Sequence, residues 1–195
     1  MKLFIVSSKE EKKNKIIEEA INLLKNEGSA GLTMRKLASA AGMTLSNLQY
    51  YFPGRSDVLE ASINYFFLWC EKNIINETER IVATSINPSE DFVDLILNLL
   101  IVNDPNDPTN IIFKELCALA VHDEALAKSF EEHYKSYIKS LIVISSGLMH
   151  NSEKVIYLLI PFAEGYSLMG TSIPVERNEI IKMLKSLIQE IIKED

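Results

Sequence analysis

Apolar residues recur every three or four positions over most of the chain, which is the spacing of one face of an α-helix. The clearest stripes run from Ile16 to Leu24, from Phe92 to Leu100 and from Ile180 to Ile191. A further stretch, from Val155 to Gly170, is apolar nearly all round. Only 7 glycines and 6 prolines interrupt these patterns in 195 residues. The chain is therefore predicted to be all-α.

Short polar segments divide this pattern into separate helices. Asn87-Pro88-Ser89-Glu90 combines a cap residue, a first-turn proline and a capping-box glutamate, so we expect a helix to begin there. The segment from Asp104 to Pro108 favours a loop, because each proline restricts the residue before it and Asp and Asn favour turns. Further helices are predicted from 57 to about 77, from 111 to 121 and from 124 to 145.

Two short helices across a tight turn are predicted between Gly31 and Leu59. Thr33 can cap the first helix, and Thr44 can cap the second. Gly42, between them, provides the backbone freedom that a sharp turn needs. Inward-facing apolar positions follow helical spacing: Met34, Leu37, Ala38, Ala41, Leu48 and Phe52. This is the layout of a helix-turn-helix.

The second of these helices lacks the Glu and Lys of an ordinary solvated surface. It offers hydroxyl, amide and phenol groups, from Thr44, Ser46, Asn47, Gln49, Tyr50 and Tyr51. Such groups bond base edges or phosphates, and Asn or Gln can contact adenine with two hydrogen bonds. Arg35, on the first helix, is the candidate for guanine. The segment is therefore predicted to bind DNA, the alternative being a helical hairpin that does not.

Three runs in this segment resemble the DNA-binding signature of TetR-type (TetR/AcrR) regulators. They are Leu32-Thr-Met-Arg-Lys-Leu-Ala38, Ala41-Gly-Met43 and Leu48-Gln-Tyr-Tyr-Phe-Pro-Gly-Arg-Ser-Asp-Val-Leu59. The resemblance covers the first third of the chain. It implies a three-helix DNA-binding domain, a larger helical domain behind it and a transcriptional regulator.

The resemblance also implies roles for single residues. Leu45, Ser46 and Asn47 would read bases, and Gln49, Tyr51 and Arg55 would hold phosphates. Gln49 stands where the family usually has Tyr, and Ser46 where Gly or Pro is common, which affects the choice of operator and not the fold. The full set of predicted DNA contacts is Thr33, Arg35, Thr44, Leu45, Ser46, Asn47, Gln49, Tyr50, Tyr51 and Arg55.

Two groups near this site have an alternative interpretation. Tyr50 and Tyr51 could instead pack against the following helix. Lys9, Lys12, Lys13 and Lys15 could contact the DNA backbone or form an ordinary solvated face.

Charge is distributed unevenly along the chain. The formal net charge of −7 divides into nine Lys or Arg against five Glu in residues 1–56, and eleven basic against twenty-two acidic residues in 57–195. The first part is thus net +4 and the second net −11, a division typical of a nucleic-acid-binding head on an acidic body. We expect a helix-turn-helix domain over 1–56 and a helical effector-binding and dimerisation domain over 57–195.

The last two predicted helices indicate a homodimer. A helix that is apolar on every side must be enclosed, and Gly165, Ser167 and Gly170 would let another helix approach closely. The alternative is a core within one chain. The resemblance to TetR-type proteins implies the same pairing of the last two helices. A dimer would place two reading helices about 34–36 Å apart on an inverted-repeat operator in double-stranded DNA.

The body also contains aromatic residues with sparse polar groups such as Glu115, His133 and Glu164. A pocket for a small, largely apolar effector could be lined by Phe66, Trp69, Phe113, Cys117, Tyr134, Tyr137, Phe162 and Glu164. The aromatic residues could instead be ordinary core. A carboxylate such as Glu164 is costly to bury unless it is paired or bound, so its alternative is a pair with a basic group or with the partner subunit. The resemblance implies a repressor that such an effector releases.

Other functions find little support. His122, His133 and His150 lack metal-motif spacing, and neither a phosphate loop nor a nucleophile elbow occurs, so we expect no enzyme, metal or cofactor. Cys70 and Cys117 are expected to be reduced core thiols. The apolar run at residues 3–6 is too short for a secretory signal and no transmembrane run appears, which favours the cytoplasm. A helical protein-interaction or lipid-binding module, or a TetR-type activator, remains the alternative.

Overall fold

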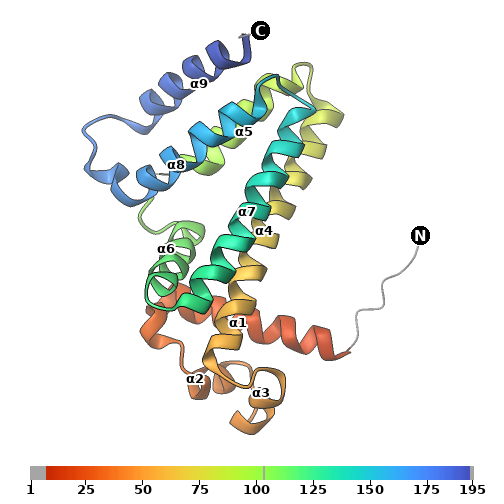
Figure 1. Cartoon of the computed structure of the whole chain (residues 1–195), viewed down its shortest axis with the longest axis vertical. Coiled ribbons are helices and arrows are strands. Elements are labelled where there is room, and N and C mark those ends of the chain that lie inside the picture. The colour runs from red at the N-terminus through yellow and green to blue at the C-terminus, as the bar shows by residue number, and fades with distance from the viewer. Residues whose placement is uncertain (1–7, 103, 194–195) are drawn as a thin grey trace. The chain divides into compact units, whose positions relative to one another are not determined.

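The computed structural model describes residues 8–102 and 104–193, and in these ranges the chain forms helices and turns without strands, as predicted (Figure 1). The apolar run at residues 3–6 lies outside the described residues. The helices are α1 (Ser8–Gly31), α2 (Met34–Ala40), α3 (Leu45–Tyr51), α4 (Arg55–Thr84), α5 (Pro88–Leu100), α6 (Pro108–Val121), α7 (Glu124–Ser146), α8 (Ser152–Met169), the short 3-10 helix η1 (Gly170–Ser172) and α9 (Arg177–Lys193). Among the described residues, no helix combines the length and apolar character needed to cross a membrane.

These helices form two compact units that do not follow the linear order of the chain. The first unit comprises the described residues up to Phe66 together with Ile111–His133. The second comprises Phe67–Asn110 and the described residues from Tyr134 onward. Helices α4 and α7 therefore contribute to both units, and α6 belongs with the helices that precede residue 66.

The first unit is built around the apolar face of α1. Buried side chains between α1 and the start of α4 include Ile16, Ile17, Ala20, Leu24, Leu37, Ala38, Leu48, Phe52, Val58, Leu59 and Ile63. Helices α6 and α7 add Ile112, Leu116 and Leu126 to the unit. The α1 segment is interrupted at Gly28, whose φ of 69° lies in the left-handed region that glycine tolerates. This break turns the chain from α1 towards α2.

The second unit has its core between α5, α8 and α9. Buried residues recur at helical spacing on each helix, and they include Phe92, Ile96, Leu97, Val155, Leu159, Ala163, Ile180, Leu184 and Ile188. Two basic residues hold α9 against α5. Arg177 donates from Nε to the Ile101 carbonyl at 2.6 Å, and the Lys185 ammonium lies 2.9 Å from Asp94 and 3.1 Å from Glu90.

The start of α5 is where the sequence predicts it, with Pro88 in the first turn, but its cap is different. The Asn87 side chain makes no capping bond to the backbone and instead donates to Glu90 at 3.0 Å. The Ser85 hydroxyl accepts the Asn87 N–H at 2.9 Å and donates to Asp91 at 2.6 Å. The turn before α5 is thus closed by Ser85, because the Asn87 side chain is occupied by its own capping-box partner.

Candidate nucleic-acid interface

The turn between α2 and α3 has the local geometry that its sequence predicts. Thr33 caps α2 by accepting the Lys36 N–H at 3.3 Å, and Thr44 caps α3 by accepting the Asn47 N–H at 3.2 Å. Gly42, in the turn, has a φ of 66°. Both caps satisfy backbone donors that have no partner inside the helix, so each short helix has a defined first residue.

Apolar contacts fix the orientation of α3. Leu48 and Phe52 are buried, and α2 contributes Leu37 and Ala38 to the same core. Since α3 is only two turns long, burial of these positions decides which side faces solvent. The exposed side carries Ser46, Asn47, Gln49 and Tyr50, a row of polar groups held on a rigid support.

The predicted DNA contacts fall into two groups by exposure. The exposed residues are Thr33, Arg35, Thr44, Ser46, Asn47, Gln49 and Tyr50, and the partly buried ones are Leu45, Tyr51 and Arg55. The Tyr50 side chain is 69% exposed, and its ring meets that of Tyr51 edge to face with centroids 5.1 Å apart. The structure therefore brings these residues together on and around α3, while their contact with DNA stays a prediction.

Arg55 has a structural partner set that the sequence does not reveal. Its Nε donates to the Leu32 carbonyl and its Nη2 to the Ser29 carbonyl, each at 2.8 Å. These two bonds tie the first residue of α4 to the end of α1 and to the turn that follows it. Part of the guanidinium is thus used inside the unit, and its other N–H groups remain for a phosphate.

Glu115 joins the same segment from α6. Its carboxylate accepts the Ser29 N–H at 2.7 Å, and a Cβ added at Gly28 would lie 3.3 Å from its Oε1. This carboxylate oxygen therefore satisfies a backbone donor near the end of α1. Helical periodicity carried no signal for the contact, since Ser29 and Glu115 are 86 residues apart.

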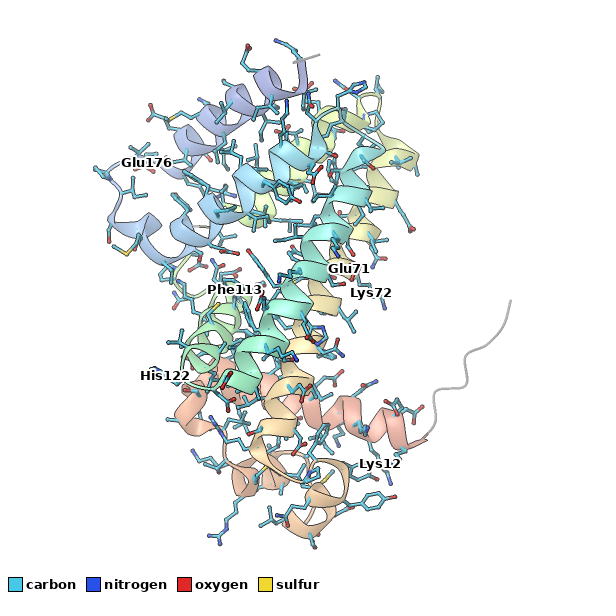
Figure 2. All side chains as sticks on the ribbon, viewed as in Figure 1. Lys12, Glu71, Lys72, Phe113, His122 and Glu176 are labelled. Carbon is cyan, nitrogen blue, oxygen red and sulfur yellow. The ribbon has the colours of Figure 1, made fainter. Side chains whose placement is uncertain are left out.

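Three of the predicted pocket residues lie in the first unit. Phe113 of α6 (Figure 2) has its ring centroid 6.3 Å from that of Phe66 and 5.9 Å from that of Phe130. Phe66 is buried, and Cys117 is a partly buried cysteine that forms no disulfide. The rings of Phe66, Phe113 and Phe130 therefore form one aromatic cluster.

The other five lie in the second unit. Tyr134 and Tyr137 each pack against Phe67 with centroids 5.8 Å apart. Trp69 is 45% exposed, and Phe162 is 37% exposed with its ring stacked on Tyr166. Burial raises the pKa of the Glu164 carboxyl, which favours its neutral form. The role of all eight residues in binding an effector stays a prediction.

Comparisons with known proteins agree with this geometry. Residues 16–62 match the family described as "Bacterial regulatory proteins, tetR family". A protein of Xanthobacter autotrophicus, described as an uncharacterised HTH-type transcriptional regulator in the dhlA 5' region, is 27% identical over 186 residues, which are 93% of this chain and 91% of that protein. The match to the family begins in α1 and ends in α4, so it spans the helices that carry the candidate interface.

Solved structures share the fold of the whole chain. The crystal structure of a TetR-family transcriptional regulator from Rhodococcus sp. has a TM-score of 0.71 at 18% identity, over 94% of this chain and 99% of that one. The multidrug binding protein EbrR complexed with imidazole has a TM-score of 0.68 at 18% identity, over 94% and 96%. Both likenesses extend beyond the helix-turn-helix to the helices that follow it in the chain.

Proposed function

We propose that this chain is a TetR-type transcriptional regulator with a helix-turn-helix DNA-binding domain, and that it acts as a dimeric repressor of a pseudo-palindromic operator. The observation that carries the proposal is the exposed polar face of α3. Ser46, Asn47 and Gln49 are exposed on a helix whose other side is buried, so packing of α3 sets the direction in which this polar face points. Preorganised polar groups of this kind suit the major groove, where each base pair presents a distinct pattern of donors and acceptors.

The homodimer is supported by apolar side chains that α8 and α9 leave exposed. On α8, the exposed Leu158, Phe162 and Met169 follow one face of the helix, next to the face that carries the buried Leu159 and Ala163. On α9, Met183 and Leu187 are exposed one turn apart. Contiguous exposed apolar surface on a folded chain is typical of an interaction site. A second copy of the chain provides a complementary apolar surface by symmetry.

The two glycines of α8 and η1 differ in what they offer a partner helix. Gly170 is buried under the Tyr166 ring of its own chain, and an added Cβ would lie 3.0 Å from that ring. It is therefore required inside the subunit and is not a contact for a partner helix, which corrects the expectation from the sequence. Gly165, which is exposed with open space around its Cβ position, keeps the proposed role.

Release of the protein from its operator is proposed to depend on the helices that follow the DNA-binding domain. A small, largely apolar effector would bind among the aromatic side chains and favour a spacing of the two heads that does not fit the operator. Effector and operator would then oppose each other through a coupling free energy of about 1–3 kcal/mol, which is ordinary for such linkage. EbrR, whose fold this chain shares, is described as a multidrug binding protein complexed with imidazole, and this supports a small molecule as the effector. Binding to an operator would also require the protein to be in the cytoplasm.

Selection of bound duplexes from a random library is expected to recover an inverted repeat. The same selection with Asn47→Ala is expected to relax the preference at one base pair of each half-site by about 1–3 kcal/mol, because Asn47 loses a base-edge contact. Glu60→Ala, which changes an exposed residue of α4, is the matched control and should leave the recovered motif unchanged. Recovery of no motif by the wild-type chain would refute sequence-specific DNA binding.

An effector is expected to raise the melting temperature and to weaken operator binding together. A melting-shift screen of hydrophobic aromatic compounds identifies stabilising ligands, and anisotropy then measures operator affinity with each at saturation. A coupling of about 1–3 kcal/mol predicts a loss of affinity of about 5- to 150-fold. Stabilising ligands that all leave operator affinity unchanged would contradict release by effector.

A further inference from the structure

Lys9, in the first turn of α1, lies against Tyr50, an exposed tyrosine of α3. Its ammonium nitrogen is 5.1 Å from the centroid of the Tyr50 ring, within the range of a cation–π contact. Both side chains are exposed, so the pair forms part of the protein surface. A positive charge is thereby placed next to α3, although Lys9 is far from Tyr50 in the sequence.

The helical position of Lys9 explains why it reaches α3. It lies seven residues, about two turns, before the buried Ile16, so it extends the face of α1 that packs inside the unit. Glu10 and Glu11 follow Lys9 at about 100° and 200° around the helix and therefore face elsewhere. Lys25, which is also exposed, lies nine residues after Ile16 and therefore on the opposite side of α1. Figure 2 labels Lys12, in the next turn of the same helix.

Tyr50 is a suitable support for this ammonium. Its ring is held from one side by Tyr51, with an interplanar angle of 86°, while Tyr51 itself is partly buried. A tyrosine has only two side-chain torsions, so the ring loses little freedom when it orders a neighbour. An ammonium that rests on a ring keeps donors that point away from the ring, and these can bind a phosphate oxygen.

We propose that Lys9 and Tyr50 form one phosphate-binding element, in which Tyr50 positions the Lys9 ammonium beside the DNA strand that borders the α3 site. The inference rests on the proposed function, because it deepens the same DNA interface. In helix-turn-helix proteins the N-terminal residues of the recognition helix contact base edges. Tyr50 is near the C-terminal end of α3, which favours the phosphate backbone over the bases as its target.

The salt dependence of binding tests the element. Operator affinity is measured against salt concentration, with the selected inverted repeat and with a scrambled duplex of equal length. Lys9→Gln in the full chain is expected to reduce the slope of log K against log salt by about 1.8 on both duplexes, since each of two subunits loses one phosphate contact worth about 0.9. Lys25→Gln is the matched control on the opposite side of α1, and its slope should equal that of the wild type.

The positioning role of Tyr50 has its own variants. Tyr50→Phe keeps an aromatic ring and should keep the contribution of Lys9 to the salt slope. Tyr50→Leu removes the ring and should remove most of that contribution. In the Tyr50→Leu background, Lys9→Gln should therefore change the slope little further. Equal slopes for Lys9→Gln and Lys25→Gln would overturn the phosphate contact. An undiminished effect of Lys9→Gln in the Tyr50→Leu background would overturn the positioning role of Tyr50. A wild-type chain without salt-dependent DNA binding would refute the proposed function as well.

Discussion

Replacing Leu187 with glutamate is expected to convert the proposed dimer into monomers and to lower affinity for the selected inverted repeat by at least about 100-fold. Leu187 is 46% exposed on α9, one turn after the exposed Met183 and beside the buried Leu184 and Ile188. A carboxylate here would have to lose its water in an apolar interface. Its cost to the free subunit is small, because the same side chain stays hydrated when no partner is present.

Loss of the dimer would affect DNA binding through geometry. A single head meets one half-site, whereas a dimer joins both half-sites of one duplex and makes the second contact intramolecular. Analytical ultracentrifugation and anisotropy with the selected duplex measure both effects on one preparation. Val143→Glu changes an apolar residue of α7 that is 72% exposed and serves as the matched control. A Leu187→Glu chain that stays dimeric, or a monomer that binds as tightly as the wild type, would contradict the proposed interface.

Replacing Arg55 with alanine is expected to lower the free energy of unfolding of the first unit by about 2–4 kcal/mol, because two carbonyls lose charged donors. Those carbonyls, of Ser29 and Leu32, connect α1 to α2, so the reading helix would lose part of its support. Arg55→Lys should rescue the loss only in part, since one ammonium does not reproduce the two-pronged guanidinium. Chemical denaturation followed by circular dichroism measures the stability.

Arg35→Ala is the matched control for this variant. Arg35 is exposed on α2, so its loss should change stability by no more than about 0.5 kcal/mol while weakening operator binding. The two variants distinguish a residue that stabilises the first unit from one that only contacts DNA. Arg55→Ala should lower both stability and DNA binding, whereas Arg35→Ala should lower DNA binding alone. If Arg55→Ala were as stable as the wild type and defective only on DNA, its role would be confined to a phosphate contact.

The helix-turn-helix was predictable because its determinants are local. Thr33 and Thr44 each bond a backbone N–H three residues ahead, and Gly42 adopts its turn conformation within a few residues. Helix ends without such signals were predicted less well. α4 begins at Arg55 and continues to Thr84, whereas the pattern indicated 57 to about 77, because neither glycine nor proline marks its end before Asn87-Pro88.

The sequence by itself determined the all-α class, the two caps, the Gly42 turn and the polar identity of the α3 face, since each depends on spacing within a few residues. Only the tertiary structure decided that Glu115 bonds Ser29, that Arg55 is partly used inside the unit and that Lys9 rests on Tyr50. It also decided which side of α8 is buried within the single chain. The periodicity of apolar residues predicts which side of a helix faces the core. A contact between distant segments depends on how whole helices pack, and no short stretch of sequence specifies that packing.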